Sequence, residues 1–74
     1  MDSYITGATI KNLREKKEIT QAQLADLLGV SDKAVSKWET AKRLPDITLI
    51  EPLAKALSVS VMELISGDMV VNKN

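Results

Sequence analysis

Residues 20–46 of this chain read TQAQLADLLGVSDKAVSKWETAKRLPD, and this stretch decides the fold. Thr20 and Gln23 have the spacing of a capping box, in which each side chain bonds the other residue's backbone N–H. The box predicts a helix that begins here and runs to about Leu28. Gly29 ends it, because glycine readily takes the left-handed conformation that follows many helices.

A second helix is predicted directly after this turn. Ser31 is its expected N-cap, and the helix covers Asp32–Thr40, with the Asp32 carboxylate at the positive end of the helix dipole. Val35 and Trp38 lie on its inward side, which makes Trp38 a core residue rather than a base-stacking platform. Two helices joined by a short glycine-containing turn have the geometry of a DNA-binding helix-turn-helix. Helical hairpins of this kind are also common in all-α domains.

Two further helices are predicted at the ends of the chain. Thr6 is the expected N-cap of a helix over Ala8–Lys17. A capping box at Ser60 and Glu63 opens a short helix that stops at Gly67.

The start of the remaining helix, which runs to about Leu57, has two readings. Pro52 lacks an N–H and is best tolerated near the first turn, which favours a start at Thr48 with Glu51 completing a capping box. Asp46 is the competing cap, and this choice places a kink at Pro52.

No period-2 strand pattern extends beyond a few residues, so the chain is predicted to be all-α. The expected architecture is a compact five-helix domain over residues 1–67, followed by a flexible C-terminal tail or linker over residues 68–74. The expected core is aliphatic, with one tryptophan: Ile10, Leu13, Leu24, Leu27, Leu28, Val35, Trp38, Leu49, Ile50, Leu53, Leu57, Leu64 and Ile65.

The composition excludes several classes of protein. The 74 residues contain no cysteine and no histidine, which removes disulfides, thiolate metal sites, the commonest general base and the commonest metal ligand. We therefore expect no enzyme, no metal and no cofactor. No apolar run approaches a membrane span and no signal peptide opens the chain, so a cytoplasmic protein is expected.

The formal net charge is zero and the pI is about 6.2, whereas a domain that binds nucleic acid strongly typically has a basic patch and a high pI. The charge is nevertheless uneven, because residues 11–43 contain eight basic and five acidic side chains. Charge alone favours a solvated surface of mixed sign.

Residues 20–46, followed by LAKALSVSVMELI at residues 53–65, resemble the lambda-repressor-like family of helix-turn-helix proteins, the Cro/C1 or XRE type. The resemblance covers about residues 10–66. It implies sequence-specific binding of double-stranded DNA by a bacterial or phage-type transcriptional regulator associated with the nucleoid. It also implies either a homodimer on a two-fold symmetric operator or the N-terminal domain of a longer protein.

The resemblance also assigns roles to individual residues. The positions that face base edges are Asp32, Lys33, Ser36 and Lys37. The positions that contact DNA phosphates are Gln21, Ser31, Thr40, Lys42 and Arg43. An ion pair between Arg14 and Glu39 is expected to tie the first helix to the end of the third, a structural role rather than a contact with DNA.

Four positions keep a second interpretation. Asp32 either accepts a hydrogen bond from a cytosine amino group or only stabilises the helix terminus. Lys33 and Lys37 are also typical of solvated lysines, and Gln21 of a helix-start residue.

One residue departs from the family pattern, which often has glycine where this chain has Ala41. Alanine resists a positive φ, so this helix is expected to end differently or to run longer, which affects the contacts of Thr40 and Lys42.

A protein-interaction or antitoxin-like module on the same scaffold is the alternative function. The neutral net charge favours it, whereas Gln21 and the two lysines of the third helix do not.

Overall fold

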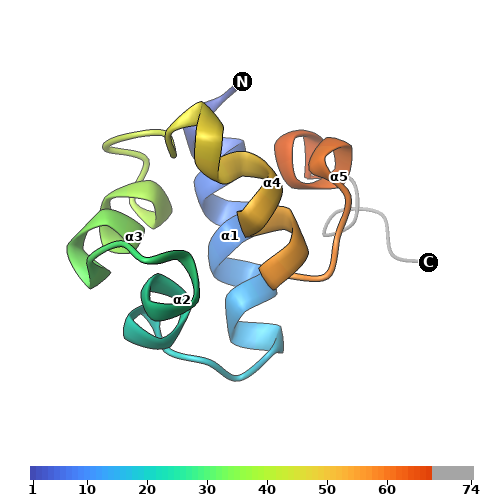
Figure 1. The fold of residues 1–74 in the computed structure, drawn as a ribbon. Helices are drawn as coiled ribbons and strands as arrows, with labels where there is room; N and C mark the ends of the chain where they lie inside the picture. Colours follow the sequence, from blue (N-terminus) through green and yellow to red (C-terminus); the bar gives the residue numbers. More distant parts are fainter. Residues whose placement is uncertain (68–74) are drawn as a thin grey trace.

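The computed structural model describes residues 1–67, and within them the chain forms five helices and no strand. They are α1 (Ser3–Lys16), α2 (Gln21–Leu28), α3 (Asp32–Glu39), α4 (Ile47–Ala56) and α5 (Val61–Ser66). The predicted five-helix, all-α class is confirmed, and the predicted tail over residues 68–74 lies outside the described residues. The longest of these helices has 14 residues, and none within residues 1–67 could cross a membrane. Figure 1 shows α2 and α3 on one side of α1 and α5 on the other.

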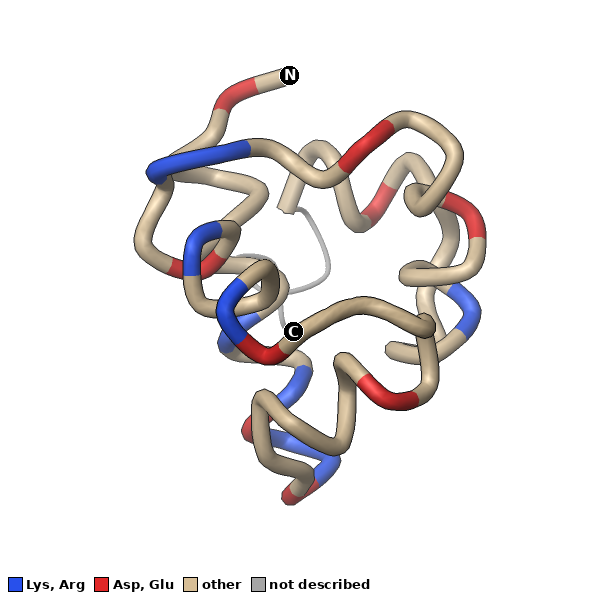
Figure 2. Tube along the Cα trace, turned by 60° about the vertical axis from the view of Figure 1, so that its left-hand side comes forward, with Lys and Arg blue, Asp and Glu red and all other residues tan. Residues whose placement is uncertain are grey.

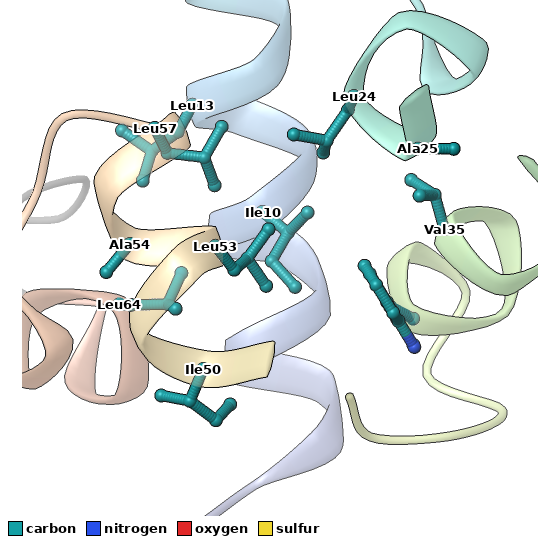
Figure 3. Packing of buried hydrophobic residues seen from close by; sticks show 11 residues of the cluster. Ile10, Leu13, Leu24, Ala25, Val35, Ile50, Leu53, Ala54, Leu57 and Leu64 are labelled. Carbon is teal, nitrogen blue, oxygen red and sulfur yellow. The ribbon is translucent and has the colours of Figure 1, made fainter. Parts of the chain in front are cut away.

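Each helix contributes one apolar side chain with no exposed surface to a common core. These side chains are Ile10, Leu24, Val35, Leu53 and Leu64. Figure 3 shows the cluster between the helices. Full burial of an aliphatic side chain stabilises a domain by about 1.5–3 kcal/mol, so this one cluster holds all five helices together. The whole buried set is Ile10, Leu13, Leu24, Ala25, Val35, Trp38, Ile50, Leu53, Ala54, Leu57 and Leu64.

The predicted core is confirmed for most residues and wrong for Leu27. Leu28, Leu49 and Ile65 are partly buried against the cluster, whereas Leu27 is 67% exposed. The inner face of α2 is centred between Leu24 and Ala25, and successive residues are about 100° apart around a helix. Leu27 therefore lies outside this face, while Leu28 lies near its centre and is only partly buried at the last position of the helix.

The predicted start of α1 is wrong, because Asp2 and not Thr6 is the N-cap. The Asp2 carboxylate accepts hydrogen bonds from the backbone N–H groups of Tyr4 and Ile5, at 2.8 and 3.1 Å. Thr6 is fully buried inside the helix. The ionised Asp2 side chain satisfies two N–H groups of the first turn, which extends the helix by more than a turn toward the N-terminus.

The favoured start of α4 is also wrong, and the competing cap is the one that forms. The Asp46 carboxylate accepts a hydrogen bond from the Thr48 N–H at 3.2 Å and another from the Thr48 hydroxyl. The helix begins at Ile47 and continues through Pro52. Two donors on one residue make Asp46 the stronger cap, and this outweighs the missing N–H of Pro52 inside the helix.

Candidate nucleic-acid interface

The turn between α2 and α3 fixes the angle between these helices. Gly29 takes φ = 70°, and the Val30 N–H returns to the Ala25 carbonyl at 3.0 Å. The chain therefore turns from α2 into α3 within three residues. Ala25 and Val35 are buried where the two helices approach (Figure 3). The small side chain of Ala25 permits this close approach, and the predicted helix-turn-helix geometry is confirmed.

The N-terminus of α3 presents hydrogen-bond donors. Ser31 is the N-cap, and its hydroxyl oxygen accepts a hydrogen bond from the Ala34 N–H at 3.2 Å. Because the hydroxyl acts here as an acceptor, its own hydrogen can still be donated to another group. The N–H groups of Asp32 and Lys33 belong to the first turn, where a helix supplies no internal acceptor. This end of α3 therefore suits an anionic ligand such as a phosphate.

The outward face of α3 carries charged side chains without ionic partners. Asp32, Lys33 and Lys37 are exposed and Ser36 is partly buried. No ion pair within residues 1–67 includes Asp32 or either lysine. Figure 2 shows basic segments of α3 and of the loop that follows it on the left of the view, beside acidic segments of α3, and mainly acidic segments of α4 and α5 on the right. The molecule thus has a basic side although its net charge is zero.

The C-terminus of α3 ends in a left-handed residue although that residue is alanine. Ala41 has φ = 63°, and its N–H bonds the Trp38 carbonyl at 3.1 Å. The next N–H, of Lys42, bonds the Lys37 carbonyl at 2.9 Å. These are the two hydrogen bonds of a Schellman motif, in which a glycine usually occupies the place of Ala41. The expectation that the helix ends differently or runs longer is therefore wrong, because both bonds offset the strain of a positive φ.

The loop after α3 extends the basic side. Lys42 and Arg43 are exposed, and the Arg43 N–H also bonds the Lys37 carbonyl, at 3.3 Å. Their side chains form no ion pair within the described part of the chain. The backbone of both basic residues is therefore held in place by hydrogen bonds to the end of α3.

The Thr40 hydroxyl, in contrast, already forms a hydrogen bond at the C-terminus of α3. The hydroxyl donates to the Ser36 carbonyl at 2.8 Å. A hydroxyl has one hydrogen to donate, and a phosphate oxygen requires a donor. The side chain of Thr40 can bind a phosphate only by giving up this bond.

A buried ion pair joins α1 to the end of α3. The Nε and Nη2 atoms of Arg14 donate to the two carboxylate oxygens of Glu39, at 2.6 and 3.0 Å. The side chains are 11% and 2% exposed, respectively. Hydrogen bonding to Glu39 raises the pKa of Arg14, so this side chain is a permanent cation. Arg14 also donates to the Ile19 carbonyl at 2.8 Å, which ties down the loop between α1 and α2.

Gln21 joins the same network, a contact that the sequence does not predict. Its side-chain Nε2 donates to Glu39 Oε1 at 2.9 Å. A glutamine amide has two N–H donors, so one remains after this bond. Gln21 is separated from Glu39 by 18 positions, and no local pattern connects the two residues.

Comparison with known proteins places this arrangement in a family. The helix-turn-helix family matches residues 10–64. The HTH-type transcriptional activator BcrR of Enterococcus faecalis is 40% identical over 62 residues, which are 84% of this chain and 30% of that protein. Repressor protein C2 of Salmonella phage P22 is 36% identical over 69 residues, which are 93% of this chain and 32% of that protein. The chain thus spans about a third of the length of these relatives.

A solved structure gives the same result for the fold. The crystal structure of the P22 c2 repressor in complex with a synthetic operator aligns with a TM-score of 0.81 and 38% identity. The alignment covers 85% of this chain and 96% of that one. The resemblance to lambda-like repressors is confirmed, and this chain belongs to the helix-turn-helix family of transcriptional regulators of the XRE or Cro/C1 type.

Proposed function

We propose that this chain binds double-stranded DNA sequence-specifically, as the DNA-binding domain of a bacterial or phage-type transcriptional regulator. The outward face of α3 carries the proposal. Its exposed Asp32, Lys33 and Lys37 have no ionic partners within residues 1–67, while its inner face is fixed by the core. In this geometry α3 lies in the major groove and α2 crosses the DNA backbone. The role implies a cytoplasmic location at the nucleoid.

The proposal divides the candidate residues between two kinds of contact. Base edges are read from one face of α3, by Asp32, Lys33, Ser36 and Lys37. Phosphates are contacted from the N-termini of α2 and α3 and from the loop after α3, by Gln21, Ser31, Thr40, Lys42 and Arg43. Of these, Ser31 has a hydroxyl hydrogen free to donate and Thr40 does not, so we expect Ser31 to contribute more.

A dimer on a two-fold symmetric operator is part of the proposal. A single small module buries only about 600–1,000 Å² on DNA, and the net charge of this chain is zero. One copy should therefore bind weakly. Two copies on half-sites about one helical turn apart double the interface.

Selection from a random duplex library, followed by mobility-shift titration of the selected site and of unrelated duplex, tests the proposal. We expect one recurring motif with two-fold symmetry and much weaker binding of unrelated duplex. Equal binding of all duplexes, or none, would contradict sequence-specific recognition and would favour a protein-interaction module.

Arg43→Ala tests the backbone contacts on the selected site. It should weaken binding of specific and unrelated duplex alike, and lower the dependence of log K on log salt by about 1, because one counterion fewer is released. Lys55→Ala on α4 removes the same charge from an exposed position outside the proposed interface, and serves as the control. An Arg43→Ala slope equal to that of Lys55→Ala would remove Arg43 from the interface.

A further inference from the structure

We infer that the operator half-site read by α3 is built around G·C base pairs, with guanine read by Lys33 and Lys37 and cytosine by Asp32. This inference rests on the proposed DNA-binding function and adds the identity of the bases. It depends on which hydrogen-bonding groups the outward face of α3 presents and which it lacks.

The two lysines present only donors. An ammonium group has three N–H donors and no acceptor. In the major groove guanine offers two adjacent acceptors, N7 and O6, whereas adenine offers N7 beside an amino group that repels a cation, and thymine offers O4 alone. Because neither Lys33 nor Lys37 has an acidic partner within residues 1–67, both side chains are available for guanine.

Asp32 presents only acceptors. Cytosine shows a single amino donor in the major groove, whereas adenine places the acceptor N7 beside its amino group, and guanine shows only acceptors. A carboxylate therefore favours cytosine and is repelled by guanine. The exposed Asp32 side chain makes no hydrogen bond or ion pair with another residue in the described part of the chain. It is also the first residue of α3, and the N-terminal residues of a recognition helix are those that contact base edges.

The side chains that select A·T pairs over G·C pairs are missing from this face, since Ser36 can bond either kind of pair. Adenine is recognised by the paired donor and acceptor of asparagine or glutamine, and α3 contains neither. Gln21 and Gln23 belong to α2 and not to this face; Gln21 is bonded to Glu39 and is proposed to contact a phosphate, and Gln23 is engaged in the capping box with Thr20. Thymine is recognised by an apolar group against its methyl. The one candidate in the first turn, Ala34, instead lines a cavity of about 250 Å³ on the inner side of α3.

The spacing of the lysines limits the extent of the G·C block. Lys33 and Lys37 are four residues apart, which is about 6 Å along a helix. Successive base pairs are about 3.4 Å apart, so the two ammonium groups reach bases within about two steps of one another. The half-site should therefore contain at least two G·C pairs within about three consecutive base pairs.

Selection from a random duplex library with the parent chain and five variants tests the inference. Lys33→Gln, Lys37→Gln and Asp32→Asn each replace a charged reader by an amide, which pairs with adenine. Lys55→Gln on α4 and Asp26→Asn on α2 make the same chemical changes at exposed positions away from this face. Binding of the parent site and of single-base variants of it is then measured at fixed salt, with the unfolding temperature of each protein.

We expect the parent motif to have at least two G·C pairs within about three consecutive base pairs. Each recognition-helix variant should change the preference at one or two of these positions toward adenine, with about a 5- to 150-fold loss on the parent base. The two control variants should select the parent motif.

Two results would overturn the inference while leaving the proposed function intact. One is a recurring motif made of A·T pairs at the central positions, and the other is a G·C motif that none of the three variants changes. No recurring motif for the parent chain would instead overturn both, and the two failures are therefore distinguishable.

Discussion

Gln21, the first residue of α2, donates its side-chain amide to the carboxylate of Glu39, the last residue of α3, across 2.9 Å. The two ends of the helix-turn-helix are thus connected by one hydrogen bond. The bond leaves one amide hydrogen of Gln21 unused, and it restricts the orientation of the amide. Gln21, which is proposed to bind phosphate, is therefore oriented by Glu39, a member of the buried ion pair with Arg14.

Gln21→Ala separates these two roles. Loss of a phosphate contact should weaken binding of the selected site and of unrelated duplex by the same factor, because phosphates carry no sequence information. Loss of one hydrogen bond to Glu39 should lower the stability by about 1–3 kcal/mol, since the acceptor is charged. DNA titrations well below the melting temperature measure the first effect alone. Unchanged affinity there, with a lowered melting temperature, would leave Gln21 a purely structural residue.

Glu39→Ala should destabilise the domain far more, because it leaves the Arg14 cation without its partner. The Glu39 side chain is 2% exposed, and removal of one member of a buried pair costs about 3–5 kcal/mol. Small domains have a total stability of roughly 5–15 kcal/mol, so thermal unfolding should shift strongly downward and DNA binding should be lost with the fold.

The double variant Arg14→Met with Glu39→Leu is the control for this interpretation. It leaves no stranded charge, so much of the stability should return. A Glu39→Ala protein that melts like the parent yet does not bind DNA would show that the pair acts on DNA directly.

Local signals in the sequence predict most of the helices, because all five N-caps bond backbone N–H groups two or three residues away. The capping boxes at Thr20 and Ser60 and the cap at Ser31 all form as predicted. At α4 two caps compete within three residues, and the choice depends on the extra bond from the Thr48 hydroxyl to Asp46. The periodicity of apolar residues in the sequence gives no information about such a side-chain hydrogen bond.

The predicted start of α1 is at Thr6, although Asp2 offers a local cap two residues before Tyr4. In the structure the helix passes through Thr6 and Gly7, and the Gly7 backbone lies directly against the Trp38 carbonyl of α3, a contact between distant residues that explains a glycine inside the helix. The resemblance to a family does indicate the candidate interface, whereas the bond between Gln21 and Glu39 requires the folded chain.

Gly7→Ala tests the close approach of α1 and α3. A Cβ atom at residue 7 would lie 2.3 Å from the Trp38 carbonyl oxygen, a backbone atom that cannot turn aside. The two helices must separate, and overpacking of this kind costs about 1–3 kcal/mol even though alanine favours helices more than glycine does. The melting temperature should fall by roughly 4 °C or more.

Asn12→Ala, at an exposed position of α1, is the matched control and should leave the melting temperature equal or slightly higher. If Gly7→Ala also raised it, α1 and α3 could not be in contact at this point.

Ala41→Gly should stabilise the domain, because Ala41 has φ = 63° at the end of α3. A left-handed conformation costs a residue with a side chain about 1–2 kcal/mol, and glycine loses part of that gain through a more flexible unfolded chain. A net gain of about 0.5–1 kcal/mol should raise the melting temperature by a few degrees. Ala8→Gly, at an exposed helical position of α1, should lower it. Equal losses in both variants would mean that Ala41 carries no strain.

Asp46 makes the start of α4 sensitive to acid. Hydrogen bonds from the Thr48 hydroxyl and, to a smaller extent, the Thr48 N–H hold the pKa of the Asp46 carboxyl below its ordinary range. A carboxyl whose pKa is lower in the folded state stabilises the fold above its unfolded value of about 3.9, and this contribution is lost as the pH falls through the folded value. The difference in melting temperature between the parent and Asp46→Asn should therefore shrink as the pH is lowered from about 5.

Thr48→Val identifies the cause of this shift, because it removes the hydroxyl and keeps the backbone N–H. The Asp46 carboxyl, followed by NMR during an acid titration, should then titrate closer to its ordinary pKa, since the larger of the two causes is gone. The acid-induced loss of stability should accordingly be smaller than in the parent and be complete at a higher pH, because the folded and unfolded pKa values of Asp46 lie closer together. A titration midpoint that does not move would assign the whole effect to the N–H bond and would leave the hydroxyl without a role in the choice of Asp46 as the cap of α4.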